Sequence, residues 1–419
     1  MDGKRPVIRK ISLFGNFGTL NIGNECTLQA ILHNIRRFLP EADVQCICSI
    51  PEDVQARHQI PAFPMSRRST RMSPATSARG PGQALGRLLR RIFLRVPGEL
   101  SELARMRRIL KGRDRLIMTG TGMLADGGEG SLGLPYEIFK WTMMARLCGL
   151  RVLFVSVGVE PIRHRLTRWL VKLSLGRADH ICFRDRQSQD SMTRMGFHRS
   201  SIVFPDLAFS LPEPILEPFG GTPAGRPVVG VGLYDYCGRG SGPGTAGQRA
   251  YGDYLAKIAD FVEWLVTGGY PVRILVGDIS YDTAVRTDLR GTLLARGLAY
   301  DEKGIVDEPV GSVPDLLDQI QSTDIVVASR FHNVILSLLL AKPVISISYN
   351  TKNDAVMADT GLPEYCLRIA DFEVAGLIEK FKAIEGRRRD VPARIRTKTR
   401  EFRAALDVQY RQIFTIRGE

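Results

Sequence analysis

The residue types best suited to chemistry stand together in one stretch, from Asp324 to Asn333. A strand-like apolar run ends there in Ser329, Arg330, Phe331 and His332, which open an apolar helix. The arginine offers a planar fork of N–H donors that suits a carboxylate or a phosphate. The histidine exchanges a proton near neutral pH, and a helix N-terminus adds affinity for anions. We therefore predict that Arg330 and His332 are catalytic and that they adjoin an anion site, because residues that only pack rarely show this combination.

Two further cations follow other predicted strands. Lys352 comes after the run 344–348, and Arg184 comes after the run 180–183. Consecutive parallel strands usually neighbour each other, which would place Lys352 beside the loop of Arg330. Arg184 has a simpler alternative role, a structural pair with Asp185. Three cations and a histidine at the ends of strands predict a small substrate with several negative charges, and we find no sequence pattern for a metal site.

Three glycine-rich loops also follow strands, at residues 15–25, 119–128 and 157–161. Glycine lets backbone N–H groups approach a ligand closely. The spacing is not that of a dinucleotide-binding loop, and each loop alone is compatible with an irregular turn. Three such loops on one edge predict a ligand-binding rim. The candidate residues in these loops are Asn21, Asn24, Glu25, Gly120, Gly122 and Glu160.

The alternation of strand-like and helical runs predicts an α/β protein with two Rossmann-like domains that face a cleft. The expected strands are 8–14, 44–49, 115–119, 152–157, 180–183, 201–204, 228–233, 272–276, 304–306, 325–328 and 344–348. The expected helices are 25–38, 136–147, 165–175, 187–195, 254–267, 284–296, 314–321, 333–340 and 393–413. A proline-rich connector at 211–227 separates an N-terminal domain, residues 1–212, from a C-terminal domain, residues 226–385. Residues 386–419 form a basic C-terminal helix with the length to pack across both domains.

The formal net charge of +14 in 419 residues is unevenly distributed. Residues 57–115 hold 15 Lys and Arg against three acids, and residues 387–403 hold eight against two, so the remainder is slightly acidic. Residues 83–96 combine leucines at helical spacing with four arginines, which predicts a basic helical excursion in the first domain. This helix could dock on an anionic membrane surface, or it could pack on its own domain. Nucleic acid is disfavoured because the cluster matches no binding motif and carries few aromatic residues.

Location follows from what the sequence lacks. The first strand begins directly after a short charged start, no apolar run reaches the roughly 18 residues of a membrane span, and the seven cysteines form no C-x-x-C pair. We therefore expect a cytoplasmic protein with reduced thiols, held peripherally on the inner face of the cell membrane if the basic helix docks there.

Taken together, these segments resemble the polysaccharide pyruvyl transferase family. The resemblance covers about residues 10–370 and is most specific in the Arg330-x-His332 helix opening and the downstream Lys352. The other matching segments are 21–25, 120–122, 157–161, 178–188, 205–209 and 342–352. Two positions depart from the family pattern, because Phe331 replaces a leucine and Asn24 replaces an aspartate.

The resemblance implies a fold similar to GT-B glycosyltransferases and a transfer from phosphoenolpyruvate to two sugar hydroxyls, giving a cyclic ketal and phosphate without a cofactor or metal. It implies that Arg184, Arg330 and Lys352, with Ser329 beside them, bind phosphoenolpyruvate and that His332 is the acid/base. The resemblance also implies that a further set of residues binds the acceptor or shapes the loops. This set comprises Asn21, Asn24, Glu25, Gly120, Gly122, Glu160 and Asp206.

The sequence thus predicts a pyruvyl transferase of surface polysaccharide synthesis acting on a lipid-linked or nucleotide-linked sugar. One alternative is a GT-B glycosyltransferase that uses a nucleotide sugar. A non-enzymatic alternative is an adaptor that binds membranes or polyanions through the basic helix.

Overall fold

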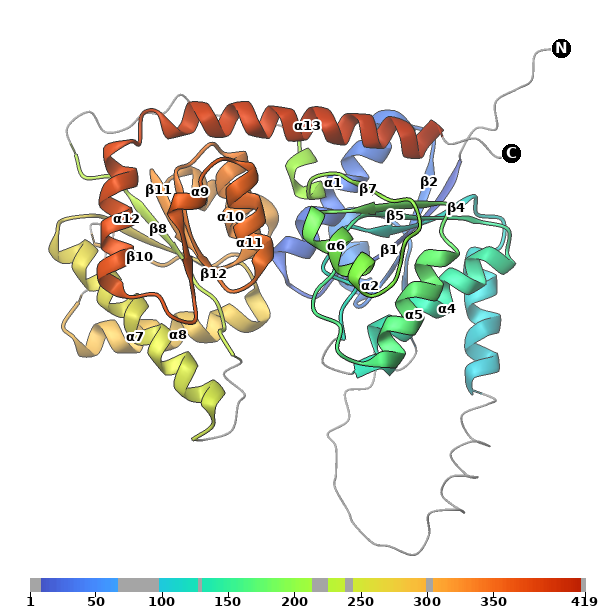
Figure 1. Cartoon of the computed structure of the whole chain (residues 1–419), viewed down its shortest axis with the longest axis horizontal. Coiled ribbons are helices and arrows are strands. Elements are labelled where there is room, and N and C mark those ends of the chain that lie inside the picture. The colour runs from blue at the N-terminus through green and yellow to red at the C-terminus, as the bar shows by residue number, and fades with distance from the viewer. Residues whose placement is uncertain are drawn as a thin grey trace, which may run out of the picture. The chain divides into compact units, whose positions relative to one another are not determined.

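The computed structural model describes residues 9–66, 98–126, 130–212, 225–237, 244–298 and 304–415. The predicted basic helix at 83–96 lies outside these ranges. The chain divides into two compact units. The first unit comprises Met1–Gly18, Ile35–Val203 and Tyr410–Glu419, and the second unit comprises Thr19–Asn34 and Phe204–Gln409. Each unit is built on its own parallel sheet (Figure 1).

The first unit contains a seven-stranded parallel sheet with the order β3-β2-β1-β4-β5-β6-β7. Its strands are β1 (Lys10–Phe14), β2 (Asp43–Cys48), β3 (Ala62–Pro64), β4 (Arg115–Thr119), β5 (Arg151–Val157), β6 (His180–Phe183) and β7 (Ile202–Val203). Its helices are α2 (Pro51–His58), a helix over residues 98–110, η1 (Gly130–Leu132), α4 (Leu134–Leu147), α5 (Arg165–Gly176) and α6 (Arg186–Arg194). The strand order reverses between β1 and β4, so the loops after these two strands flank the switch point of the sheet.

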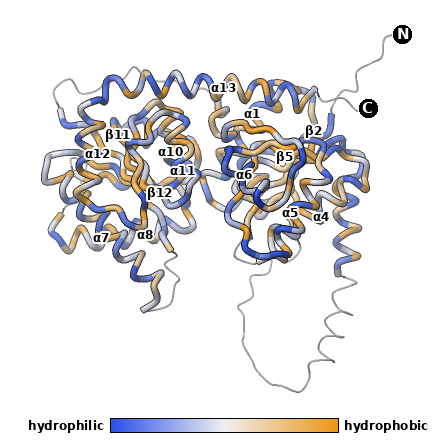
Figure 2. The backbone as a smooth tube through the Cα atoms, viewed as in Figure 1, coloured by the Kyte–Doolittle hydropathy of each residue, from blue (hydrophilic) through white to orange (hydrophobic). Residues whose placement is uncertain are grey.

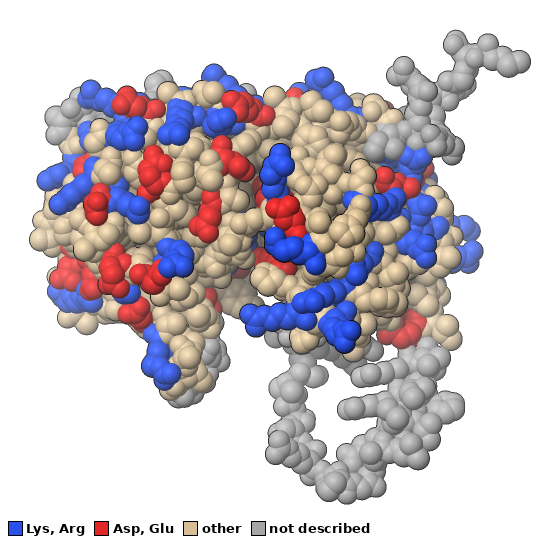
Figure 3. Space-filling view, in the orientation of Figure 1, with Lys and Arg blue, Asp and Glu red and all other residues tan. Residues whose placement is uncertain are grey.

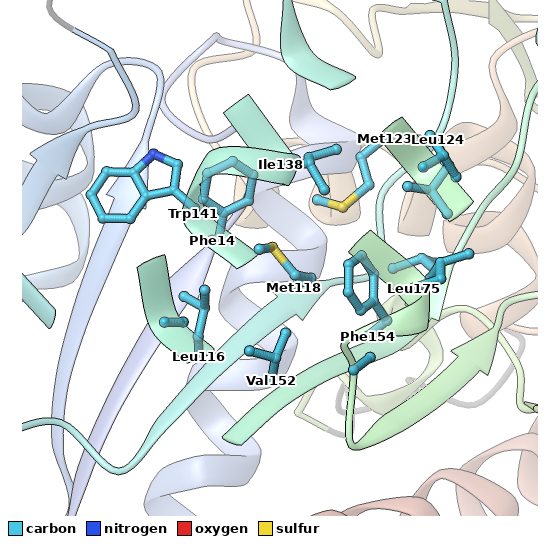
Figure 4. Packing of buried hydrophobic residues seen from close by; sticks show 14 of the residues in the cluster. Phe14, Leu116, Met118, Met123, Leu124, Ile138, Trp141, Val152, Phe154 and Leu175 are labelled. Atoms are coloured by element: carbon cyan, nitrogen blue, oxygen red, sulfur yellow. The ribbon is translucent and has the colours of Figure 1, made fainter. Parts of the chain in front are cut away.

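The core of the first unit lies where helices cover the sheet. All five residues of β4 are buried, as expected for a central parallel strand covered on both faces. Phe14, Met118, Phe154 and Trp141 come from neighbouring strands and from α4 (Figure 4), and the indole Nε1 donates to the Met65 carbonyl at 2.9 Å. Figure 2 shows the same pattern as hydrophobic colour concentrated on strands such as β5 and β11.

The second unit repeats this plan with a six-stranded parallel sheet in the order β10-β9-β8-β11-β12-β13. Its strands are β8 (Val229–Gly232), β9 (Val272–Leu275), β10 (Ile305–Val306), β11 (Ile325–Ala328), β12 (Val344–Ser348) and β13 (Cys366–Arg368). Its helices are η2 (Leu207–Ser210), α7 (Ala246–Thr267), α8 (Ile279–Ala295), α9 (Val313–Gln321), α10 (Phe331–Leu339), α11 (Thr351–Asp359), η3 (Pro363–Tyr365) and α12 (Val374–Gly386). Here the order reverses between β8 and β11, which is the switch point of this sheet.

Two helices contribute residues to both units. Helix α1 (Ile22–Phe38) belongs to the second unit through Asn34 and to the first from Ile35 onward. Helix α13 (Val391–Thr415) belongs to the second unit through Gln409 and to the first from Tyr410 onward.

The predicted fold class, two parallel-sheet α/β domains, is confirmed. Four strands match the prediction to the residue: β4, β6, β11 and β12. Helix α7 begins eight residues before the predicted start, because Thr245 caps it through a hydrogen bond from the Gln248 N–H, ahead of the apolar periodicity. The predictions missed the helix over residues 98–110 and also α2, β3, α11, β13 and α12. Of these, α2, β3, α11 and β13 are at most nine residues long.

Replacement of Phe154 by Ala tests the core of the first unit. We expect a loss of about 3–5 kcal/mol in the free energy of unfolding, because the ring is completely buried and its removal leaves a cavity. Urea unfolding measures it. Leu147→Ala is the matched control, since that side chain is 79% exposed and its loss should cost under about 0.5 kcal/mol. Equal costs for the two variants would contradict this description of the core.

Candidate functional site

Polar and aromatic residues gather at the switch point of the second unit. Arg330 follows β11, Tyr234 follows β8, Asp278 follows β9 and Tyr349 follows β12. These strands are neighbours in the sheet, and all of them are parallel. Their carboxyl ends therefore meet at one edge, which is where open α/β sheets bind their ligands.

Arg330 occupies the N-cap position of α10, and its guanidinium is held by a buried carboxylate. Its Nε and Nη2 donate to the two oxygens of Asp282 at 2.8 and 2.7 Å, and its Nη1 lies 3.7 Å from Asp278 Oδ2. Asp282 is completely buried and also accepts the backbone N–H groups of Asp235 and Asp278, at 3.1 and 3.0 Å. One carboxylate thus fixes the loops after β8, β9 and β11.

The pKa values at this ion pair follow from burial and charge. Burial raises the pKa of Asp282 and of Asp278 above the usual range, although the positive charge of Arg330 opposes the rise in both. Burial alone would lower the pKa of Arg330, but the charge and hydrogen bonds of Asp282 outweigh it and raise that pKa. Arg330 therefore stays protonated at any physiological pH.

The sequence analysis selected Arg330 as one of three cations and named no acid beside it, and the structure adds two carboxylates. Asp278 and Asp282 both lie against the guanidinium, so much of its charge is already compensated. Sequence reasoning missed Asp282 because its contact with Arg330 depends on the strand order β9-β8-β11, which is a tertiary feature. The available signal was two acids four residues apart, directly after a predicted strand and at the start of a helix.

Two stacked tyrosines connect two of the predicted cations. The rings of Tyr234 and Tyr349 lie 4.2 Å apart at an interplanar angle of 22°. Arg330 Cζ lies 4.5 Å from the Tyr234 centroid, and Lys352 Nζ lies 5.0 Å from the Tyr349 centroid and 5.6 Å from that of Phe331. Because β11 pairs with β12, the expected proximity of Lys352 to the Arg330 loop is confirmed. The sequence analysis did not select the tyrosines.

His332 lies in the first turn of α10, next to the buried Asp206. The distance from His332 Nε2 to Asp206 Oδ1 is 3.9 Å, and Asp206 also accepts the Ala208 N–H at 2.9 Å as the cap of η2. On the other side of the imidazole is Gly23, where an added Cβ would stand 2.0 Å from His332 Nδ1. Any larger side chain at this position would clash with the imidazole, so the first loop requires glycine there for steric reasons.

Residues 19–25 of the first glycine-rich loop belong to the second unit and form hydrogen bonds within it. Asn21 Nδ2 donates to Asp278 Oδ2 at 2.7 Å, and Asn21 Oδ1 accepts the Asn24 N–H at 3.2 Å. Two backbone hydrogen bonds join the same segments. The Ile22 N–H donates to the Gly277 carbonyl at 3.1 Å, and the Ile279 N–H donates to the Leu20 carbonyl at 3.0 Å. Glu25 is buried in the first turn of α1. Asn21 and Asn24 thus hold the loop that contacts His332.

Ser329 is completely buried under the Arg330 loop. Its hydroxyl lies 3.1 Å from that of Tyr254, whose pKa is raised by burial, and its carbonyl accepts from Asn353 Nδ2 at 3.1 Å. These contacts fix the end of β11. Direct binding of a ligand by Ser329 stays a prediction.

The remaining predicted residues form a separate group in the first unit. Arg184 is buried and lies 3.4 Å from Asp185, and an added Cβ at Gly158 would stand 2.3 Å from its Nη2. The loops after β4 and β5 are joined by a bridge between Leu124 and Val159. Within them, a Cβ at Gly122 would lie 3.0 Å from Glu160 Oε1, and one at Gly120 would lie 2.5 Å from the Ser156 carbonyl oxygen.

The structure thus sorts the predicted residues into two groups, one in each unit. The group in the second unit comprises Asn21, Asn24, Glu25, Asp206, Ser329, Arg330, His332 and Lys352. The group in the first unit comprises Gly120, Gly122, Glu160 and Arg184. Across the described ranges, no group of three or more His, Cys, Asp and Glu side chains is arranged to hold a metal ion. None of the helices in the described part of the chain is long and apolar enough to cross a membrane.

Two parallel-sheet α/β units of the Rossmann type place the chain in the GT-B fold class, and solved structures agree. The chain resembles UDP-GlcNAc 2-epimerase from Neisseria meningitidis bound to UDP-GlcNAc (TM-score 0.56, 12% identity, covering 97% of this chain and 100% of that one). It also resembles a putative UDP-N-acetylglucosamine 2-epimerase from Listeria monocytogenes (0.58, 10%, 97% of each chain) and a glycosyltransferase from Rickettsia africae (0.58, 11%, 97% of each). At these identities the likeness shows the fold alone.

The sequence model of one family, polysaccharide pyruvyl transferase, matches residues 21–351. The chain belongs to this family, and it is therefore a transferase. The matched range includes every residue of the two groups except Lys352, which directly follows the last matched residue, Thr351.

A double-mutant cycle tests the pair of Arg330 and Asp282. We expect Asp282→Asn and Arg330→Gln each to lower the free energy of unfolding by about 3 kcal/mol, since each leaves a buried partner uncompensated. The double variant should lose less than the sum of the two, by about 1–3 kcal/mol. Urea unfolding measures all four proteins, with the exposed Asp318→Asn as control. Additive losses would show that the two side chains do not interact.

Proposed function

We propose that the protein transfers a pyruvyl group from phosphoenolpyruvate to a sugar of a polysaccharide or of a lipid-linked oligosaccharide precursor. The product would be a cyclic ketal, with release of phosphate. One observation carries the proposal: in a chain of this family, Arg330 and His332 open α10 at the switch point of the second unit, with Lys352 at the start of the next helix. Helix N-termini and fixed cations suit a donor that carries about three negative charges.

The fixed orientation of Arg330 supports a role in holding the donor. Of the five N–H groups of an arginine, two are given to Asp282. The others include those on Nη1, and we propose that they contact the carboxylate or the phosphate of phosphoenolpyruvate. Lys352 would add a second positive charge. The family resemblance assigns Arg184 to the same donor, and we propose it as a third ligand.

The proposed reaction balances without a cofactor. A proton from His332 adds to the methylene carbon of the donor, which becomes a methyl group and leaves the adjacent carbon electrophilic. A sugar hydroxyl forms one C–O bond to that carbon, the bond to phosphate breaks, and a second hydroxyl forms the other C–O bond of the ketal. Of the two hydroxyl protons released, one restores His332 and the other leaves on phosphate. Asp206, 3.9 Å from the imidazole, is suited to orient it.

The acceptor side is proposed from the family resemblance. We propose that Glu160, Asp206 and the loops of Gly120 and Gly122 contribute to acceptor binding, while Asn21, Asn24 and Glu25 shape the loop against His332. The enzyme would act in the cytoplasm, and an acceptor linked to lipid would be met at the inner face of the cell membrane.

A second candidate is a GT-B glycosyltransferase that takes a nucleotide sugar. The fold favours it, because structural neighbours of this chain carry names of UDP-GlcNAc enzymes and of a glycosyltransferase. Family membership favours the pyruvyl transferase, and the two candidates differ in the donor that they consume.

Release of inorganic phosphate from phosphoenolpyruvate tests the proposal. We expect release only when a galactoside, mannoside or related glycoside with neighbouring free hydroxyls is present. His332→Gln should lower kcat by about 10²–10⁴-fold, because the proton donor is lost. Arg330→Lys should lower kcat/KM by about 10²-fold or more, because a lysine has no planar fork. His198→Gln, an exposed histidine of the first unit, is the matched control.

Circular dichroism and urea unfolding should show that the variants fold. Consumption of UDP- or GDP-sugars with phosphoenolpyruvate left intact would contradict the proposal and favour the glycosyltransferase. Full activity of the His332 variant would remove that residue from the mechanism.

A further inference from the structure

Helix α5 in the first unit presents large apolar side chains to solvent. Leu166 is 46% exposed and Trp169 is 53% exposed, and their spacing of three residues puts them on one face of the helix. The η1 segment is fastened to this helix by a hydrogen bond of 2.8 Å between Ser131 and Thr167, and its Leu132 is 63% exposed. Single exposed apolar residues are ordinary, but a group on adjoining elements marks an interaction surface.

Trp169, the aromatic residue of this group, packs against a second aromatic ring. The Trp169 ring lies 6.2 Å from that of Phe139 on α4, at an interplanar angle of 38°. Helix α4 packs against α5 and contributes Trp141 to the core. The exposed Trp169 indole therefore rests on a helix that is itself anchored in the core. Tryptophan is enriched at boundaries between apolar and polar surroundings, because its ring is apolar and its N–H group is polar.

The surroundings of these side chains are strongly basic. Residues 161–178 contain no Asp or Glu but five Lys and Arg: Arg163, Arg165, Arg168, Lys172 and Arg177. Arg163, Arg165 and Arg168 are exposed, together with His164. The nearby Asp126 accepts the backbone N–H groups of Arg163 and His164, the closest at 2.6 Å. Figure 3 shows Lys and Arg gathered over the part of the first unit where Figure 1 draws α5.

We propose that this surface, formed by Leu132, Arg163, Arg165, Leu166, Arg168 and Trp169, binds an anionic lipid bilayer. The apolar side chains would enter the interface, and the arginines would contact lipid phosphates. A nucleic acid would satisfy the arginines but leave Leu166 and Trp169 in water. A lipid surface accommodates both, because its phosphates lie directly above its acyl chains. The proposal concerns described residues and is independent of the predicted helix at 83–96.

Vesicle binding by the full-length protein tests this proposal. We expect vesicles of phosphatidylcholine with about one third phosphatidylglycerol to retain the protein in sedimentation, and pure phosphatidylcholine to retain much less. The triple variant R163Q/R165Q/R168Q should bind about 100-fold more weakly, from a factor of about five for each charge. The variant L166Q/W169Q should bind at least about tenfold more weakly. The matched control, R387Q/R388Q/R389Q, removes three basic residues from the second unit and should bind like wild type.

Tryptophan fluorescence reports the depth of insertion. Trp141 is completely buried and Trp264 is partly buried, so in the Trp264→Phe variant the exposed indole is Trp169. Brominated acyl chains should quench this indole when the vesicles contain phosphatidylglycerol. Bound protein with unquenched Trp169, or wild-type binding by both α5 variants, would overturn the proposal.

Two further outcomes would also overturn it. One is loss of binding only when Arg87, Arg90, Arg91 and Arg95 are changed to Gln, which would assign membrane binding to residues 83–96. The other is a dimer without lipid that L166Q/W169Q dissociates, which would make this surface an interface between copies. Phosphate release with a soluble glycoside should be unchanged in the α5 variants, so failure of this proposal leaves the proposed reaction untouched.

Discussion

The arrangement of the second unit depends on the ion pair between Arg330 and Asp282. The carboxylate is completely buried and accepts four hydrogen bonds, two from the guanidinium and two from backbone N–H groups after β8 and β9. An uncompensated buried carboxylate would be costly, so the loops that supply these donors are held in one arrangement. The same pair sets the plane of the guanidinium, which stacks on Tyr234 and through it on Tyr349. Loss of either charge would therefore disturb the loops after β8, β9 and β11.

The histidine depends on contacts between residues far apart in sequence. Gly23 lies against the imidazole of His332, and Asn21 bonds to Asp278, the capping residue of α8. These contacts join the loop after β1 to loops that follow β9 and β11. They explain why the loop combines asparagines and glycine: the amides bind it in place, and the missing side chain admits the imidazole. The loop thus helps to position His332, which lies some three hundred residues further along the chain.

Sequence reasoning succeeded where the signal was local. Buried parallel strands are short apolar runs, so β11 and β12 were predicted to the residue, and the residues that follow them, Arg330 and Lys352, could be placed at one edge. It failed where the signal was tertiary. Asp282 and Tyr234 become site residues only because β9, β8 and β11 are neighbours, and α11 was missed because its sequence is largely polar. The resemblance to the family, by contrast, rested on spaced motifs and is confirmed over residues 21–351.

The central claim is that the Arg330 and His332 site protonates phosphoenolpyruvate and transfers its pyruvyl carbons to a sugar. Carbon and proton NMR of a reaction run in D₂O with phosphoenolpyruvate labelled with ¹³C at its central carbon tests this most directly. The account predicts that the label moves from an enol carbon to a ketal carbon attached to two sugar oxygens, and that the new methyl group carries one deuterium. A label that remains in phosphoenolpyruvate in the presence of competent sugar acceptors, while a nucleotide sugar is consumed, would contradict it.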